Sequence, residues 1–251
     1  MCRQLTIQQL VKSGPIIESA KRTLGSKGRQ FLASVLSLVN ENPRLAECEP
    51  MSVYNSCLIA ATLDLPINRN LGFAYVVPYG NEKKAQFQMG YKGYVQLGIR
   101  SGQFLDLDAR EVHEGEFLGL DEMTGAPRFK FDITKQSASV CGYMAYFELT
   151  NGFRKFMYMD NSQVRKHARK YSKNYDRKSS IWSTDFNAMA KKTVLKLLLS
   201  KFAPLSTDMA RAIEEDQKVD GEYLDNPKNV QRNKGLHVEN AQVGEVKEVT
   251  E

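Results

Sequence analysis

Residues 140–159 read VCGYMAYFELTNGFRKFMYM. Two runs within this stretch, 140–149 and 154–159, are rich in aromatic and apolar side chains, and Asn151-Gly152 lies between them. Asn-Gly between two β-prone runs is the strongest short-range signal for a β-hairpin, because both residues accept the positive φ angles of a tight turn. The sequence therefore predicts two antiparallel strands here.

Weaker strand signals precede this hairpin. Residues 72–77 are aromatic and β-branched, a turn sequence follows at 78–81, and residues 85–89 continue as a strand, which predicts a second hairpin. Between residues 105 and 110, apolar and charged side chains alternate, as is typical of a strand with one buried face. Residues 114–128 contain Thr-Gly-Ala-Pro and are expected to form a loop.

Apolar residues at helical spacing lie before, between and after these strands. Ser52 is the expected N-cap of the second predicted helix, and Pro204 ends the longest helix because the residue before a proline avoids the helical conformation. The order of helices, strands and helices predicts an α+β fold, in which a small antiparallel β-sheet with hairpins packs against helices. The predicted helices cover residues 29–42, 53–63, 91–100, 160–171, 185–202 and 208–218.

The composition excludes several classes of protein. The chain has 251 residues, of which 42% are hydrophobic and 25% charged, so it is neither wholly disordered nor too short to bury a core. No apolar run reaches the roughly 18 residues that a membrane span needs, and the N-terminal residues lack the apolar run of a secretory signal. The four cysteines form no CxxC pair, so we expect neither a zinc site nor a disulfide framework. This use of cysteine predicts a cytoplasmic location.

Positive charge is concentrated in one part of the chain. Residues 154–201 contain 13 Lys/Arg and 3 Asp/Glu, whereas residues 1–153 contain 16 and 15. Residues 205–251 are acidic, with 6 Lys/Arg and 11 Asp/Glu, and beyond Gly221 they are polar and expected to be disordered. The basic window predicts a polyanionic partner, most simply a nucleic acid, although many charge runs are only solvated surfaces.

The basic residues in and near this window are candidates for phosphate contacts. Arg165 and Arg169 are one helical turn apart, as are Lys166 and Lys170, so they form a stripe on the helix predicted at 160–171. Lys192 and Lys196 are expected to lie away from the buried side of the longest helix, where they could meet either DNA or an acidic neighbouring subunit. The full set is Lys92, Arg100, Arg154, Lys155, Arg165, Lys166, Arg169, Lys170, Lys178, Lys191, Lys192 and Lys196.

Three aromatic residues lie close to these cations in the sequence. Tyr91 and Tyr94 flank a lysine and a glycine, and Trp182 precedes the longest helix. Flat rings beside cations suit single-stranded nucleic acid, whose bases can stack on them. The three residues are therefore candidates for stacking or for shaping a groove, with core packing as the alternative for Tyr94 and Trp182.

Motifs of several enzyme classes are absent from the sequence. It contains neither a G-x-x-x-x-G-K-[ST] phosphate loop nor a G-x-G-x-x-G motif after a strand, so no ATP requirement and no cofactor are expected. A run of carboxylates could bind the metal ion of a metal-dependent nuclease. The simpler interpretation is that these carboxylates lie on the exposed side of a strand and in the loop that follows it. These residues are Asp106, Asp108, Glu111, Glu114 and Glu116.

Four stretches of the sequence, between about residues 40 and 216, resemble the RecT family of phage and prophage single-strand DNA annealing proteins. The first is LGFAYVVPYGN at 71–81, and the second is GYKGY at 90–94 followed by RSGQ at 100–103. The third is Trp182 with MAKKT at 189–193, and the fourth is FAPLS at 202–206. Each stretch alone is a weak signal, but the four occur in order at spacings similar to those of the family.

This resemblance implies a recombinase that binds single-stranded DNA, pairs it with a complementary strand and holds the new duplex, without ATP and without a covalent catalytic step. It implies a basic DNA-binding groove, a homo-oligomeric ring or helical filament, and two protein partners: a phage 5′→3′ exonuclease and the host single-strand DNA-binding protein. The expected division is an N-terminal arm at 1–26 that could contact other subunits, an annealing core at 27–216 and a flexible acidic tail at 217–251. A single-strand-binding protein that does not anneal is the alternative.

Overall fold

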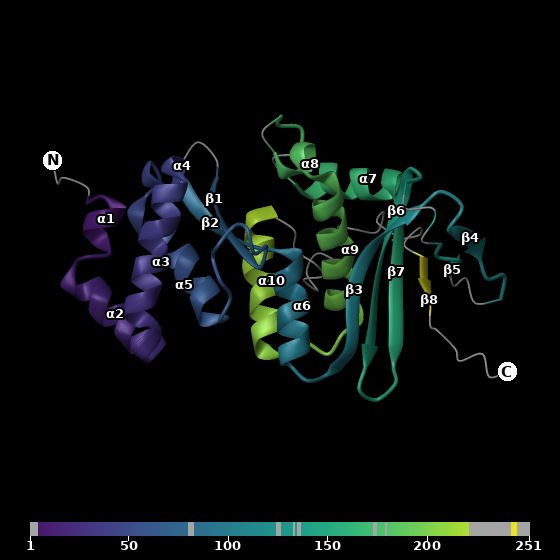
Figure 1. Ribbon diagram of the computed structural model, residues 1–251, viewed down its shortest axis with the longest axis horizontal. Helices are drawn as coiled ribbons and strands as arrows, with labels where there is room; N and C mark the ends of the chain where they lie inside the picture. The colour runs from purple at the N-terminus through teal and green to yellow at the C-terminus, as the bar shows by residue number, and fades with distance from the viewer. Residues whose placement is uncertain are drawn as a thin grey trace, which may run out of the picture. The chain divides into compact units, whose positions relative to one another are not determined.

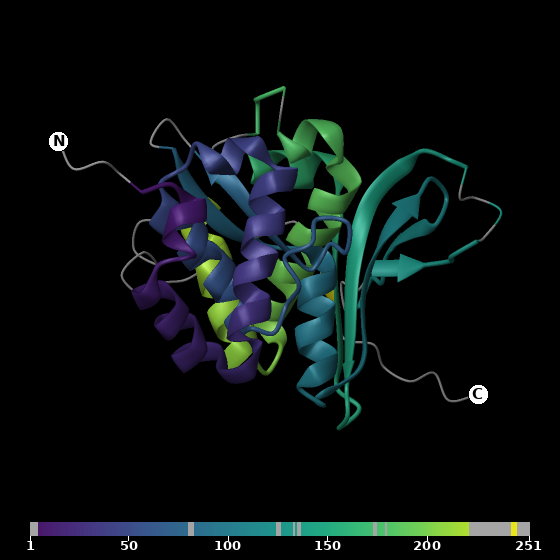
Figure 2. The same ribbon diagram turned by 60° about the vertical axis from the view of Figure 1, so that its left-hand side comes forward.

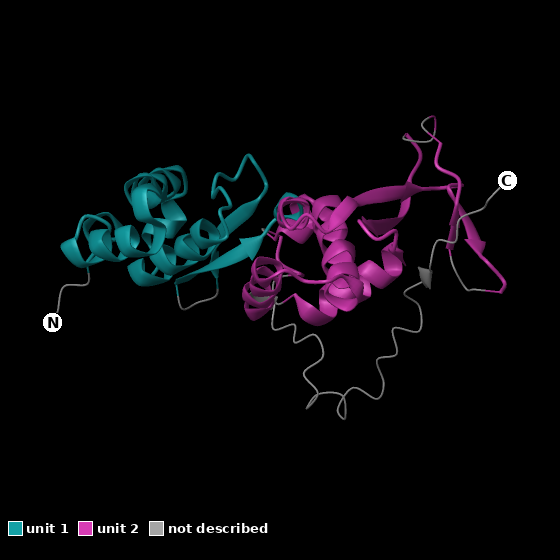
Figure 3. Cartoon of the chain, turned by 90° about the horizontal axis from the view of Figure 1, so that it is seen from below, with its two compact units in different colours: residues 1–93 teal, residues 94–251 magenta. Residues whose placement is uncertain are grey.

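The computed structural model describes residues 5–79, 83–123, 127–132, 134, 137–172, 175–178, 180–220 and 242–244 (Figures 1 and 2). The chain divides into two compact units, Met1–Gly93 and Tyr94–Glu251, which are coloured separately in Figure 3. Both helices and small antiparallel sheets are present, so the predicted α+β class is confirmed. No helix in the described part of the chain is long and apolar enough to cross a membrane.

The first unit consists of helices and one β-hairpin. Helix α5 packs against strand β2 of the hairpin. The two strands of this hairpin pair Ala74 with Met89, which confirms the hairpin predicted from the sequence. Its elements are α1 (Ile7–Leu10), α2 (Gly14–Leu24), η1 (Gly25–Lys27), α3 (Gly28–Glu41), α4 (Pro43–Ala46), α5 (Pro50–Thr62), β1 (Ala74–Tyr79) and β2 (Lys84–Met89).

Helix α5 begins earlier than predicted. Its N-cap is Glu49, and Pro50 occupies the first turn, where the missing N–H of proline has no helical partner to lose. The expectation that Ser52 is the N-cap is therefore wrong. The Ser52 hydroxyl instead donates to the carbonyl of Glu49 at 2.6 Å.

Two glycines explain the GYKGY motif at the start of α6 (Tyr91–Arg100). A Cβ atom on Gly90 would collide with the backbone oxygen of Gly72, and one on Gly93 would collide with that of Phe73. The amide of Gly90 also donates to the Phe73 carbonyl at 2.9 Å. The motif thus lets the chain that leaves β2 pass directly against the loop that precedes β1.

The second unit is built on an antiparallel sheet with strand order β3-β6-β7-β8 (Figures 1 and 2). Its strands are β3 (Phe104–His113), β6 (Val140–Leu149), β7 (Arg154–Asp160) and β8 (Gln242–Gly244). The register pairs Ala145 with Met157 across the predicted Asn-Gly hairpin, which is confirmed. Helix α9 (Phe186–Phe202) contacts β3, β6 and β7, and α7 (Asn161–Tyr171) contacts β6, β7 and α9, so both helices lie on one face of the sheet.

A second small sheet lies where a loop was predicted. Strands β4 (Phe117–Leu120) and β5 (Pro127–Phe129) pair with each other, so the expectation of a loop throughout 114–128 is wrong. The Phe117 ring stacks on Tyr158 of β7 at a centroid distance of 4.8 Å, and the Phe129 ring meets Tyr158 at 5.5 Å. These contacts join residues far apart in the sequence, so local spacing does not reveal them.

The described C-terminal part of the chain contains one more helix than predicted, and its last helix ends later than predicted. A short helix, α8 (Ile181–Thr184), precedes α9, and α10 (Thr207–Asp220) runs past the expected start of the tail at 217. Residues 242–244 form strand β8, which pairs with β7. The prediction of a disordered tail falls otherwise on residues 221–241 and 245–251, which lie outside the described residues.

Candidate nucleic-acid interface

Helix α7 presents its basic residues to solvent because of how the helix begins and packs. The Asp160 carboxylate accepts from the Gln163 amide at 2.8 Å, and the Gln163 side chain accepts from the Asp160 amide at 2.9 Å, which forms a capping box. Val164 and Ala168 are buried and fix the inner side of the helix. The four cations on the outer side, Arg165, Lys166, Arg169 and Lys170, are all exposed and are called the α7 basic face below.

Aromatic rings hold the two arginines of this face. The Arg165 guanidinium lies over the Phe186 ring, 4.4 Å from its centroid, and the Arg169 guanidinium lies over Tyr175 at 5.6 Å. Trp182 contacts both rings, with centroid distances of 5.8 Å to Tyr175 and 5.6 Å to Phe186. The stacked guanidinium groups keep their N–H edges free for phosphate oxygens, since stacking uses only the faces of the plane.

The α7 basic face is not neutralised by carboxylates of the described residues: none of its four cations forms an ion pair with one. Lys178, in the segment between α7 and α8, is also exposed and makes no such pair within the described residues. Exposed cations that no carboxylate neutralises attract a polyanion and release its counterions on binding. The geometry therefore suits contacts with a phosphate backbone.

Comparison with known proteins decides the family. A sequence profile described as "RecT family" matches residues 29–231. The chain belongs to the RecT family. It is 47% identical over 213 residues to the uncharacterised protein YqaK of Bacillus subtilis strain 168, an alignment that covers 84% of this chain and 72% of YqaK. It is 33% identical over 191 residues to Protein RecT of Escherichia coli K12, covering 72% of this chain and 68% of that protein.

Membership of the RecT family confirms the resemblance found in the four sequence stretches. It also supports a general role in DNA recombination, with binding and annealing of single-stranded DNA.

Two lysines predicted to contact DNA are buried in this RecT-family protein. Lys192 and Lys196 are 5% and 3% exposed, and their ammonium groups lie 2.8 Å and 3.5 Å from the two carboxylate oxygens of Asp216, which is fully buried. The expectation that both lysines lie away from the buried side of the helix is wrong. The reason is that α9 is covered by the sheet and also by α10, so it has no single buried stripe.

Lys191 differs from these two lysines. Its side chain is 29% exposed, and its ammonium group lies 3.3 Å from a carboxylate oxygen of Glu111 on β3. Lys191 thus remains within reach of solvent, but a phosphate would have to compete with Glu111 for it.

The predicted aromatic residues occupy different environments. Tyr94 is fully buried and donates its hydroxyl to Asp216 at 3.1 Å, so this packing does not allow base stacking by Tyr94. Trp182 is 7% exposed and packs against the rings of Phe186 and Tyr175, as the core-packing alternative expects. Tyr91 is half-buried.

The remaining candidate cations are dispersed. Arg154 donates to Glu148 at 3.0 Å, and the Lys155 ammonium lies over the Phe202 ring at 5.0 Å, so both already have partners. Arg100 is exposed at the end of α6. Lys92 is exposed and belongs to the first unit, whereas the α7 basic face belongs to the second.

The carboxylates between 106 and 116 are partly engaged in structural contacts. Glu111 pairs with Lys191, and Glu116 accepts from the backbone amides of His113 at 2.7 Å and Asp132 at 3.1 Å. Burial acts to raise the pKa of Glu116, but these hydrogen bonds and the His113 imidazole, 3.3 Å from the carboxylate, together outweigh burial and lower the pKa. No three His, Cys, Asp or Glu side chains of the described residues form a group that could hold a metal ion.

Proposed function

We propose that this RecT-family protein binds single-stranded DNA along the α7 basic face and anneals complementary strands without ATP, a cofactor or a covalent catalytic step. The observation that carries the proposal is the set of four exposed cations on α7 that no described carboxylate neutralises. Arg165 and Arg169 are additionally oriented by the rings beneath them.

The physical basis of annealing is charge screening followed by base pairing. Two complementary strands repel each other through their phosphates, and a basic groove reduces this repulsion while raising the local strand concentration. If the protein holds the backbones and leaves the base edges free, pairing and stacking drive the reaction with about 1.4 kcal/mol per base-pair step. Such a protein contacts phosphates rather than base edges, so it has no need to read sequence.

The proposal extends to the partners and the setting of the reaction. Self-association into a ring or helical filament would hold the nascent duplex, a phage 5′→3′ exonuclease would expose the single strand, and the host single-strand DNA-binding protein would meet the complex. All of this would take place in the bacterial cytoplasm. The resemblance to the family supports these partners, and the annealing activity itself can be tested without them.

The test is strand annealing without nucleotide. Two labelled complementary oligonucleotides are mixed with the protein at low and at high ionic strength, and pairing is followed by energy transfer. The proposal expects pairing faster than the spontaneous rate, with an acceleration that falls steeply as salt increases. Binding without acceleration would instead identify a strand-coating protein, and magnesium-dependent cleavage lost in Asp108→Asn would identify a nuclease.

A further inference from the structure

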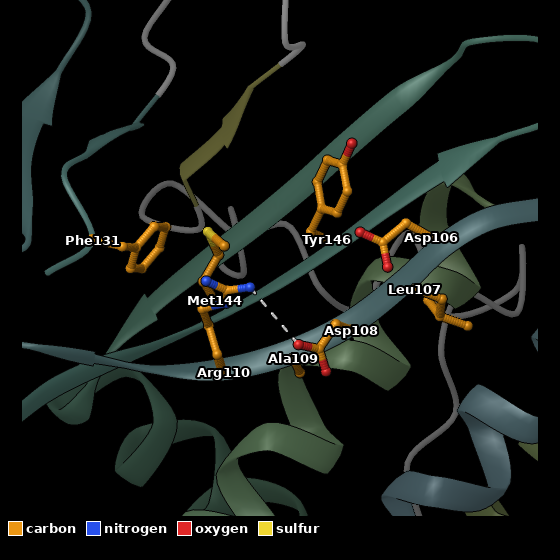
Figure 4. Close-up of a pocket in the computed structure, with 8 residues that line it drawn as sticks. All are labelled: Asp106, Leu107, Asp108, Ala109, Arg110, Phe131, Met144 and Tyr146. Carbon is orange, nitrogen blue, oxygen red and sulfur yellow. Dashed lines mark ion pairs between the residues drawn. The ribbon is translucent and has the colours of Figure 1, made fainter. Parts of the chain in front are cut away.

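The face of the sheet opposite α9 contains an open hollow of about 360 Å³ (Figure 4). Along β3, Leu107 and Ala109 are buried on the α9 side, so Asp106, Asp108 and Arg110 alternate onto this other face. The register places Tyr146 and Met144 of β6 beside them, and the Phe131 ring closes one end, with the Arg110 guanidinium 4.7 Å from its centroid.

The hollow has Asp106 at one end and the Phe131 ring at the other, and between them the Arg110 guanidinium lies 4.0 Å from a carboxylate oxygen of Asp108 (Figure 4). Asp106 is exposed, lies directly across from Glu148 in the register, and has no ion-pair partner among the described residues. Glu148, by contrast, already has partners: it accepts hydrogen bonds from Arg154 and Tyr146, which lower its pKa. A hollow with a free carboxylate beside apolar side chains fits a lysine or arginine, whose aliphatic stem packs while its charged end meets the carboxylate.

The first unit supplies a basic surface, opposite in charge to the hollow. Residues 94–153, which include β3 and β6, contain 5 Lys/Arg and 9 Asp/Glu, whereas the first unit, residues 1–93, contains 11 and 6. Lys21 and Arg22 in the last turn of α2 and Arg29 at the start of α3 are exposed, and none of them pairs with a described carboxylate. These three cations are called the α2–α3 corner below.

The α2–α3 corner is closely packed. Gly28 lies so near the preceding helix that a Cβ atom on it would come within 2.9 Å of the Ala20 carbonyl oxygen and 3.0 Å of the Lys21 Cα. The close packing of η1 and α3 onto α2 keeps the cations on one compact surface, so ordering them on binding costs little backbone entropy.

We infer that the hollow on the sheet receives the α2–α3 corner of a second copy of this chain. Opposite charges would steer this contact and fix its register, because one surface is acidic and the other basic. The two surfaces differ, so the contact is head-to-tail and generates a ring if it closes and a helical filament if it does not. The inference specifies the self-association proposed above.

This arrangement keeps assembly and DNA binding on different sides of the sheet. The α7 basic face lies on the α9 side, where Arg165 stacks on Phe186 of α9, whereas the hollow is on the opposite side. An acidic hollow would repel a DNA backbone, but it attracts a basic protein surface. Assembly and strand binding can therefore be altered separately by substitution.

The test is charge reversal on each surface, with assembly measured by sedimentation velocity in the absence of DNA. Asp106→Lys with Asp108→Lys reverses the hollow, and Arg22→Glu with Arg29→Glu reverses the corner. We expect each double variant to weaken self-association at least about tenfold, and the chain carrying all four changes to regain it, because the opposite charges are restored in swapped positions. Circular dichroism and thermal unfolding verify that each variant is folded.

A matched control reverses two exposed carboxylates that do not line the hollow, Glu122→Lys and Glu214→Lys, and should leave self-association within about twofold of the wild type. The inference is overturned if both double variants assemble like the wild type, if the four changes together give no recovery, or if the wild type stays monomeric at low ionic strength. Strand binding by each variant is measured separately. Assembly without any DNA binding would contradict the proposed function and leave this inference standing.

Discussion

The Lys192 ammonium group donates a hydrogen bond to Asp216 at 2.8 Å, within the packed interior of the second unit. This contact joins α9 to α10, and the Tyr94 hydroxyl adds α6 to the same carboxylate. Burying ionised groups removes them from water at a cost of several kcal/mol for each ion, so the cluster is stable only while its partners remain together. A lysine that helical spacing assigns to the surface thus belongs to the core.

Removing the carboxylate should destabilise the protein more than removing one lysine. Asp216→Ala leaves two buried ammonium groups without their shared partner, and we expect the free energy of unfolding to fall by about 3–5 kcal/mol. Lys192→Ala should cost less, because Lys196 still lies 3.5 Å from Asp216. Lys191→Ala, on a half-exposed pair, should cost less than about 1 kcal/mol.

Urea denaturation of the three variants checks this order. If Lys192→Ala is no less stable than Lys191→Ala, the buried cluster does not contribute as described. Because Lys192→Ala is expected to lose stability, weaker DNA binding by that variant would not identify Lys192 as a phosphate ligand.

The α7 basic face gives a prediction about salt dependence. Each phosphate contact to a single strand contributes about 0.7 to the slope of log affinity against log salt concentration. Lys166→Ala with Lys170→Ala should therefore reduce the magnitude of that slope by about 1.4 while leaving the fold intact, since both side chains are exposed. Fluorescence anisotropy with an unstructured oligonucleotide across a salt series measures the slope.

The matched control for this slope is Lys12→Ala with Arg44→Ala, which removes two exposed cations from the first unit. It should leave the slope within experimental error of the wild type. Equal changes in both double variants would mean that net charge, rather than the α7 basic face, determines binding.

Local signals predicted some elements well, and contacts between distant residues explain the errors. The hairpin around Asn151-Gly152 and the helix predicted at 160–171 depend on residues within a few positions of one another, and both are found in the structure. The burial of Lys192 depends on α10 covering α9, which spacing within α9 does not reveal. A signal was nevertheless present, since Asp216 follows Met209 by two helical turns on the buried side of α10.

Spacing within a helix predicts which side chains are exposed only if the helix packs on one side. This condition holds for α7 but not for α9, which carries Lys192. Arg165 and Arg169 lie opposite Val164 and Ala168 on a helix that packs with one side only, so its spacing separates buried from exposed residues correctly. The rings beneath the two arginines come from residues 175 and 186, beyond the helix, and no local pattern connects them.

Close packing at the start of α6 gives a prediction about stability. Gly93→Ala would place a Cβ atom against the Phe73 carbonyl oxygen and near the Met89 side chain, and backbone cannot yield as a flexible side chain does. We expect a loss of about 2–3 kcal/mol in the free energy of unfolding. Gly14→Ala is the control, because nothing lies within 4 Å of its Cβ position in the first turn of α2, and it should change stability by less than about 1 kcal/mol. Equal effects in thermal unfolding would show that the contact with Phe73 is relaxed at little cost.

The Glu116 carboxylate gives a prediction about acid stability. Burial alone would raise its pKa, but hydrogen bonds from the His113 and Asp132 amides, together with the His113 imidazole 3.3 Å away, lower it below the ordinary 4.5. The native state therefore binds this proton less readily than the unfolded chain, so the carboxylate stabilises the fold above pH 4.5 and the contribution is lost as pH falls through the lowered pKa. Glu116→Gln should cost about 1.5–3 kcal/mol at neutral pH, because it weakens charge-assisted hydrogen bonds.

The difference in stability between the wild type and Glu116→Gln should shrink as pH falls below 4.5, since the wild-type side chain then becomes neutral as well. Urea midpoints of both proteins, measured from neutral pH to below that value, follow this difference directly. Glu114→Gln changes an exposed neighbour and should retain the wild-type pH profile. A difference between the wild type and Glu116→Gln that stays constant with pH would mean that the negative charge of Glu116 does not strengthen its contacts with the two amides and the His113 ring, and that shape alone holds the segment after β3 in place.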